Sequence, residues 1–153
     1  MNEYAQKEDG WCGPAALSFA LSQIGIEKNQ EQIVMDTGTT KSKGVDPAPL
    51  RKAAESYGAE VEIMNGESAE QTLDAIDKEV KNGASVIVDY LVSGKEDGGH
   101  YVVFLGVKGN NIRIFDPSGG KKDEMQKHYF FENWKDYTEN GKVMKNWAMV
   151  MRA

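Results

Sequence analysis

The sequence contains little that could cross-link the chain or bind a metal through sulfur. Its one cysteine, Cys12, excludes a disulfide within the chain and a zinc site built from several thiolates. Long apolar runs are also lacking, since none approaches the roughly 20 residues of a membrane span. No basic segment followed by an apolar one opens the chain, as it would in a signal peptide. We therefore expect no transmembrane segment and a cytoplasmic location by default, with a secreted or membrane-associated parent protein as the alternative.

An excess of positive charge is missing as well. The 18 Lys and Arg residues are outnumbered by 24 Asp and Glu residues, which gives a formal net charge of −6. This balance argues against nucleic acid and against an anionic membrane surface as main partners. With 40% hydrophobic and 27% charged residues, the composition is that of an ordinary globular protein. Its 153 residues suffice for a real core, and we expect a single domain over residues 1–153.

The first half of the chain carries helical patterns. Pro14 suits the first turn of a helix, and apolar residues follow it at helical spacing until Gly25. Ser68 and Gln71 form a capping box for a later helix that ends at Gly83. Together with two shorter patterns, these signals predict helices over residues 14–24, 30–36, 46–57 and 68–82. Residues 37–49 and 93–99, rich in Gly and polar residues, are predicted to be loops.

The second half carries strand patterns. Residues 86–88 and 101–105 are unbroken apolar runs, which are typical of central strands buried on both faces. Apolar residues alternate with polar ones around residues 61–63, 112–114 and 147–151, which indicates further strands. Helices first and a mostly antiparallel sheet after them predict an α+β fold.

Cys12 lies in the segment Gly10-Trp11-Cys12-Gly13-Pro14, at or just before the start of the first predicted helix. The unpaired backbone N–H groups and the dipole of a helix start favour an anion, so a thiolate is stabilised there. The flanking glycines allow the backbone to approach a ligand closely. The alternative is a small buried hydrophobic residue, the commonest fate of a free cysteine.

A nucleophilic thiolate needs a base, and the base needs an orienting group. His100 opens the apolar strand that follows Gly98-Gly99, and the next predicted strand ends at Asp116. A tight hairpin turning at residues 108–110 would place His100 directly opposite Asp116, within hydrogen-bond reach on one face. The alternative is a histidine at a strand edge and an aspartate that caps a turn before Pro117. His128, in an aromatic stretch, is interpreted as a surface or packing residue.

Four pieces of the sequence follow one another in a fixed order: Gln6, Cys12-Gly13-Pro14, His100-Tyr101-Val102-Val103 and Asp116-Pro117. Together they resemble papain-like cysteine peptidases. The resemblance is strongest to the bacteriocin-processing peptidase family, whose members cleave double-glycine leader peptides and often lie at the N-terminus of ABC transporters. Trp11 stands where that family usually has an acidic residue. The resemblance implies a papain-like fold, with a helical lobe that bears the cysteine packed on a sheet that bears the histidine and aspartate.

The resemblance also implies a mechanism. Cys12, His100 and Asp116 would form the catalytic triad of a thiol protease, and Gln6 with the Cys12 N–H would form the oxyanion hole. Cleavage would follow small residues such as Gly, and the reaction needs no cofactor or metal. Gly10, Trp11 and Gly99 are expected to bind the substrate, and residues 37–45 and 93–99 to line the cleft.

Partners follow from the same resemblance. We expect a peptide substrate and a link to a transporter or to a longer parent protein. The acidic residues near His100 would favour a positively charged substrate; they are Asp89, Glu96 and Asp97. Oligomeric state is left open by the sequence.

Three classes of alternative compete with peptide hydrolysis, and the first class uses the same triad for a different reaction. The same triad could pass the acyl group to an amine or thiol, as in transglutaminase-like or phytochelatin-synthase-like acyltransferases. It could also act as an endoisopeptidase or amidase on cell-wall peptides. A non-catalytic peptide-binding module is the second class of alternative. A mixed zinc site of Cys12, His100 and Asp116 is the third, although such a site would need neither Gln6 nor a helix opened by proline.

Overall fold

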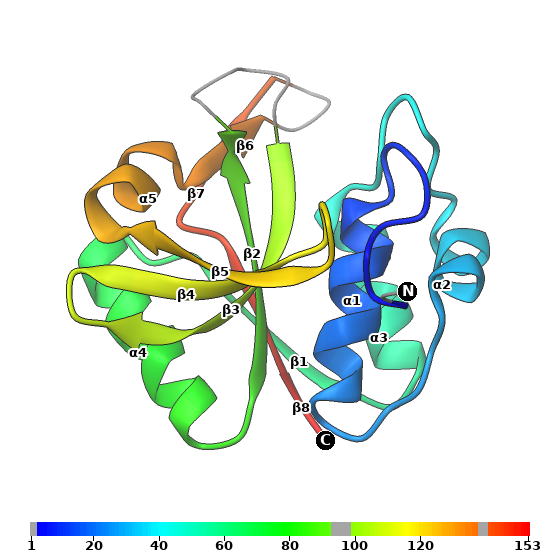
Figure 1. Ribbon diagram of the computed structural model, residues 1–153, viewed down its shortest axis with the longest axis horizontal. Helices are drawn as coiled ribbons and strands as arrows, with labels where there is room; N and C mark the ends of the chain where they lie inside the picture. The colour runs from blue at the N-terminus through cyan, green and yellow to red at the C-terminus, as the bar shows by residue number, and fades with distance from the viewer. Residues whose placement is uncertain (1–2, 93–98, 138–140) are drawn as a thin grey trace.

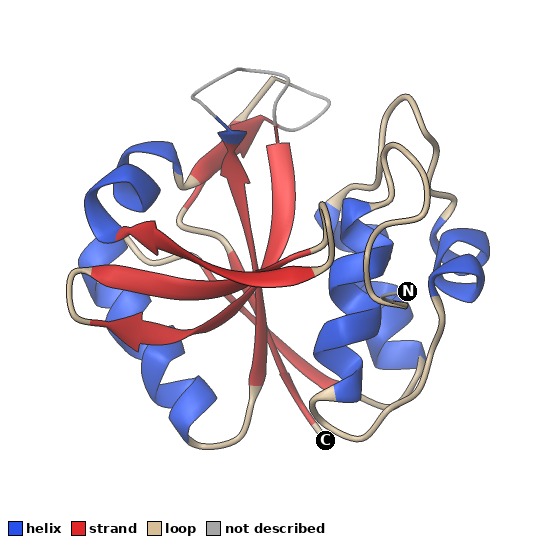
Figure 2. Ribbon diagram, viewed as in Figure 1, coloured by secondary structure: helices blue, strands red, loops and turns tan. Residues whose placement is uncertain are grey.

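The computed structural model describes residues 3–92, 99–137 and 141–153, and it gathers three helices beside a twisted sheet that carries two more helices on its far side (Figure 1; Figure 2). The helices are α1 (Cys12–Ser22), α2 (Gln30–Thr37), α3 (Pro47–Ser56), α4 (Ala69–Lys81) and α5 (Lys127–Asn133). The strands are β1 (Glu60–Met64), β2 (Ser85–Leu91), β3 (Gly99–Lys108), β4 (Asn111–Asp116), β5 (Lys121–Gln126), β6 (Lys135–Tyr137), β7 (Val143–Lys145) and β8 (Ala148–Arg152).

The main sheet has six strands in the order β1-β8-β2-β3-β4-β5, and each neighbouring pair is antiparallel. The C-terminal strand β8 lies between β1 and β2, so the end of the chain is part of the core. Strands β6 and β7 form a separate two-stranded sheet. The predicted α+β class, with a helical lobe on a mostly antiparallel sheet, is confirmed.

Two hydrophobic cores lie on opposite faces of this sheet. On β2, on β8 and on β3 before its bulge, odd-numbered apolar residues such as Ile87 and Val103 pack with α1, α2 and α3. The even-numbered ones, such as Val88 and Val102, pack with α4 and α5. These central strands are therefore buried on both faces, which is why their sequences are unbroken apolar runs.

Local signals account for the helix boundaries. The Asn29 side chain caps α2 by accepting a hydrogen bond from Gln32 N–H, and Gly38 ends that helix with a left-handed φ of 72°. Ser68 caps α4 by accepting from Gln71 N–H, as the capping box predicted. Strand β5 and helix α5 were not predicted, because β5 is an exposed edge strand of charged residues without apolar alternation.

The predicted register of the β3–β4 hairpin is wrong. Lys108 pairs with Asn111, so the turn consists of residues 109–110 alone. A bulge between Phe104 and Gly106 shifts the ladder, and Val103 then pairs with Phe115. At that end the register lies two residues away from the predicted one, so His100 is not directly opposite Asp116.

Candidate active site

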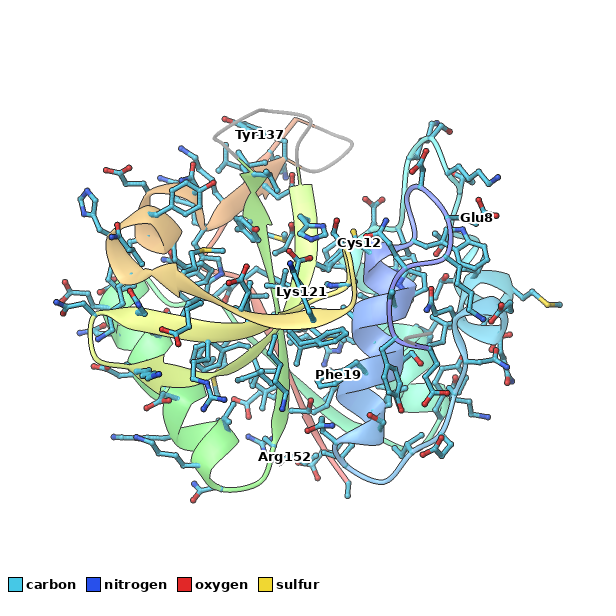
Figure 3. All side chains as sticks on the ribbon, in the orientation of Figure 1. Glu8, Cys12, Phe19, Lys121, Tyr137 and Arg152 are labelled. Atoms are coloured by element: carbon cyan, nitrogen blue, oxygen red, sulfur yellow. The ribbon has the colours of Figure 1, made fainter. Side chains whose placement is uncertain are left out.

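Cys12 is the first residue of α1, as its place before Gly13-Pro14 predicted. Trp11 precedes the helix and makes no side-chain cap, so the first backbone N–H groups of α1 keep their capacity to bind an anion. The Cys12 side chain is partly buried and is a free thiol. Figure 3 shows Cys12 at the end of α1, on the side of the helical lobe that is turned toward the strands.

His100 is hydrogen-bonded to both of its predicted partners. Its Nε2–H donates to Asp116 Oδ1 at 2.7 Å, and its ring also forms a hydrogen bond with Cys12. Because Nε2 is taken by Asp116, Nδ1 is the ring nitrogen left for the sulfur. The edge of the Tyr90 ring packs against the imidazole, with ring centroids 6.0 Å apart. Asp116 Oδ1 accepts a second hydrogen bond from Ser118 N–H at 2.9 Å, which fixes the carboxylate.

The surroundings of His100 favour its charged form. Burial works against the imidazolium, but the hydrogen bonds to Asp116 and Cys12, together with their negative charges, outweigh it and raise the pKa of His100 to about 9. The imidazole is therefore protonated at neutral pH, as it is in a thiolate–imidazolium pair.

Gln6 lies on an N-terminal segment that is held at both sides. Its backbone N–H donates to Pro117 O at 2.8 Å, which ties it to the residue after Asp116. The buried Gln30 side chain bonds the backbone around Gln6: it donates to Glu3 O and Ala5 O and accepts from Lys7 N–H, at 2.8–3.1 Å. The Gln6 amide itself donates to Glu8 O at 3.3 Å. Gln30 had no signal in the sequence, because its role depends on contacts distant along the chain.

A cavity of about 310 Å³ opens beside Cys12. One wall is the loop between α2 and α3, which is closed by backbone hydrogen bonds between Thr40 and Gly44. The Tyr101 hydroxyl donates to Val45 O at 2.9 Å and holds the end of this loop. The opposite wall consists of Asp89, Gly99, Asp136, Tyr137 and Met144. A cavity of this size fits a short stretch of peptide.

Two glycines allow the helix start and the loop to meet. A Cβ at Gly10 would lie 2.5 Å from Thr40 O, and one at Gly13 would lie 2.5 Å from Val45 Cγ1. Gly10 also has a φ of 78°, which side chains rarely adopt. Both glycines that flank Trp11-Cys12 therefore allow the helix start to lie close to this loop, and the predicted approach to a ligand stays a prediction.

The predicted substrate-binding residues are only partly brought together. Gly10 and Gly99 line the cavity, whereas Trp11 is not among the described residues that line it. The predicted loop over residues 93–99 lies outside the described residues except for Gly99, and Glu96 and Asp97 lie there too. His128 is 84% exposed and pairs with Glu132 at 2.9 Å on α5, which confirms it as a surface residue. Asp136 lines the cavity as well, although no signal in the sequence pointed to it.

Over residues 3–92, 99–137 and 141–153, no group of three His, Cys, Asp or Glu side chains is placed to hold a metal ion. In that same part of the chain, no helix has both the length and the apolar character needed to cross a bilayer.

Comparison with known proteins gives a family and a fold. Residues 2–142 match the model of the Peptidase_C39 like family. Two curated relatives are 28% identical over 134 residues: the lactococcin transport/processing ATP-binding protein LcnC-like of Lactococcus lactis subsp. lactis (strain IL1403), and the lactococcin-A transport/processing ATP-binding protein LcnC of Lactococcus lactis subsp. lactis. The match covers 87% of this chain, which spans 18% of the length of either relative.

Three solved structures share the fold. The peptidase domain of Streptococcus ComA, a bi-functional ABC transporter, superposes with a TM-score of 0.75 at 21% identity, over 97% of this chain and 95% of that one. A putative C39-like peptidase from Bacillus anthracis superposes with a TM-score of 0.77 at 18% identity, over 100% of this chain and 94% of that one. A double glycine motif protease from an AMS/PCAT transporter was solved in complex with the leader peptide. It superposes with a TM-score of 0.69 at 22% identity, over 97% of this chain and 89% of that one. The predicted papain-like fold is confirmed.

Proposed function

The chain belongs to the Peptidase_C39 like family, and from that premise we propose that it is a cysteine peptidase. The observation that carries the proposal is the contact of His100 with both Cys12 and Asp116. A thiol at a helix start, an imidazole bonded to it and a carboxylate behind the imidazole are the three parts that a thiol protease needs.

The reaction begins from the thiolate–imidazolium pair. The Cys12 thiolate attacks the carbonyl carbon of the scissile amide, while His100 carries the proton on Nδ1 that faces the sulfur. The carbonyl oxygen becomes an oxyanion as the C–S bond forms. Asp116 accepts a hydrogen bond from Nε2–H throughout, so it fixes the ring orientation and stabilises the imidazolium.

The oxyanion is bound by the Cys12 backbone N–H and the Gln6 side-chain amide. The first group lies at the start of α1, where the N-cap residue Trp11 makes no side-chain cap, and the second lies on the segment held by Pro117 and Gln30. The Gln6 amide exchanges its 3.3 Å bond to Glu8 O for a shorter bond to the oxyanion. One such donor is worth about a hundredfold to a thousandfold in rate.

Collapse of the tetrahedral intermediate breaks the C–N bond. His100 delivers its proton to the departing amine, which leaves Cys12 acylated as a thioester. His100 then takes a proton from water, and the hydroxide formed attacks the thioester. The acid is released, and the Cys12 thiolate and the imidazolium are restored.

The substrate is a peptide cut after a small residue such as Gly. Two features support this: one relative is a double glycine motif protease solved with a leader peptide, and the cavity beside Cys12 is confined between the Thr40–Gly44 loop and the Asp89 and Asp136 carboxyls. We propose that residues 1–153 are one peptidase domain. By analogy with the transport/processing relatives, it works with a transporter or a longer parent protein.

Alkylation of Cys12 tests the proposal. Iodoacetamide is applied between about pH 4 and 9, and the alkylated residue is identified by mass spectrometry. The wild type should react far below the free-thiol pKa of about 8.5, and His100→Ala should react only near it. His128→Ala is the matched control, because that histidine is exposed on α5 and should leave the profile unchanged.

Product analysis then separates the kinds of chemistry. Peptides containing Gly-Gly should yield free acids, whereas acylation of an added amine or thiol would indicate an acyltransferase. If wild type and His100→Ala both react only near the free-thiol pKa, Cys12 is no nucleophile and the chain is a peptide-binding module.

A further inference from the structure

Two aspartates from distant parts of the chain meet beside the proposed active site. Asp89 lies on β2 with only 2% of its surface exposed, and Asp136 lies on β6. Their side chains are hydrogen-bonded to each other, and both line the cavity that contains Cys12. The mechanism above uses neither residue.

Within the described part of the chain, both carboxyls also contact residues beside the cleft. Asp89 Oδ1 accepts a hydrogen bond from the backbone N–H of His100 at 3.2 Å. Asp136 Oδ1 accepts one from Tyr137 N–H at 2.7 Å. The Asp136 carboxyl also lies against Gly99 so closely that no Cβ fits there. Asp136 thus packs on the residue before His100, and Asp89 bonds His100 itself.

The hydrogen bond between the two carboxyls requires a proton. An ionised carboxylate only accepts hydrogen bonds, so two carboxylates in contact repel each other unless one of them is protonated. Burial raises the pKa of Asp89 well above its ordinary value, and the bond to Asp136 and the nearby Cys12 add to this effect. Tyr101, which pairs with Asp89 across the β2–β3 ladder, brings a phenol and no positive charge.

The cavity's cations lie on its other wall. Lys41 and Lys43 belong to the loop between α2 and α3, together with Asp46, and Lys41 pairs with Glu8 at 3.1 Å. The groups that act on Asp89 are Asp136, Cys12 and the N–H of His100, and only the last of these favours an ionised Asp89.

We propose that Asp89 is a neutral carboxylic acid whose O–H donates a hydrogen bond to Asp136, and that this pair positions His100. The hydrogen bond holds β6 against β2 and β3, while Asp89 Oδ1 fixes the backbone from which the imidazole extends toward Cys12. Asp89 and Asp136 are thus positioning residues, and the inference rests on the proposed function only for the role of His100.

Infrared spectroscopy tests the protonation directly, without reference to activity. The difference spectrum of wild type minus Asp89→Asn at pH 7 should contain the carbonyl stretching band of a protonated carboxylic acid. Asp136→Asn should keep that band, since Asp89 retains the proton. Absence of the band from wild type, or its presence in Asp89→Asn, would overturn the proposal.

Variants at position 89 test the positioning role. Asn can donate through its Nδ2 and accept through its Oδ1, so Asp89→Asn should keep the rate and pH profile of Cys12 alkylation within about threefold. Asp89→Ala loses both bonds and should slow alkylation by about tenfold or more below pH 8, where only the ion pair reacts. Thermal unfolding of each variant identifies loss of folding.

The two proposals fail in different ways. If the rate of Cys12 alkylation in Asp89→Asn falls as far as in Asp89→Ala while both variants are folded, the ionised form of Asp89 is required and the inference is wrong. An unchanged Asp89→Ala profile would also refute the positioning role. If His100→Ala leaves alkylation unchanged, the proposed function fails, whereas the infrared band still reports the state of Asp89.

Discussion

The Nε2 of His100 lies 2.7 Å from Oδ1 of Asp116, although the two residues are not opposite each other on the β3–β4 ladder. Near the turn, Lys108 pairs with Asn111, and this register continued without a break would put His100 and Asp116 on opposite faces of the sheet. The bulge between Phe104 and Gly106 inserts one residue into β3. It returns the two side chains to one face as diagonal neighbours, which is close enough for their hydrogen bond.

Replacing Gly106 should therefore damage the site from a distance. Its φ of 138° is accessible to glycine and rarely to other residues, so Gly106→Ala strains the bulge by about 1–3 kcal/mol. We expect slower Cys12 alkylation at pH 6 and a lower free energy of unfolding in urea. Gly109→Ala is the control: it has a φ of 60° in the turn and open space around it, so it should lose stability but keep the alkylation rate. Equal alkylation in both variants would show that the bulge does not position His100.

The His100–Asp116 pair should set the alkaline limit of reactivity. The pKa of His100 is raised to about 9, so the imidazolium is present below that pH and is lost as the pH rises through it. Asp116→Asn keeps an acceptor oxygen but removes the negative charge, which should lower the pKa of His100. In pH–rate profiles of peptide cleavage, the alkaline limb should therefore move to lower pH, and kcat should fall. An alkaline limb that stays near 9 in Asp116→Asn would contradict this account.

Much of this site was predictable because its signals are local. The helix start at Cys12 follows from Gly13-Pro14, and the buried strand that begins near His100 follows from its apolar run. The pairing of His100 with Asp116 was predicted for the right residues but through the wrong register. The tight turn and the bulge each shift the ladder, and the sequence around Gly106 does not reveal how many residues the bulge inserts.

The unpredicted parts depend on contacts between distant segments. Asp136 reaches Gly99 and Asp89 only because the short strand β6 packs beside β2 and β3. Strand β5 is charged and exposed, so no hydrophobic period indicates it. Helix α5 is too short for apolar residues to recur at a clear helical spacing, and its position is set by the burial of Phe130 against Trp134.

Gly13 should control how closely the loop of the cleft approaches Cys12. In Gly13→Ala the new Cβ would lie 2.5 Å from Val45 Cγ1 and 3.2 Å from Tyr101 Cδ2, so the Val45 end of the loop must move. We expect a higher KM for peptides, with Cys12 alkylation by the small reagent iodoacetamide little changed. Shortening the neighbour in Gly13→Ala/Val45→Ala should restore KM. If the double variant is no better than Gly13→Ala, the contact with Val45 is not what shapes the cleft.

Gln30 should act on catalysis only through Gln6. Its buried side chain makes three hydrogen bonds to the backbone around Gln6, so Gln30→Ala frees the segment that carries the proposed oxyanion donor. Peptide cleavage by Gln30→Ala should fall nearly as far as in Gln6→Ala, about a hundredfold. Alkylation of Cys12, which forms no oxyanion, should stay constant, and Gln32→Ala on the exposed side of α2 should be inert. The double variant should be no slower than Gln6→Ala, because residues that act as one unit are not additive. Additive losses would mean that Gln30 supports the fold and not the oxyanion hole.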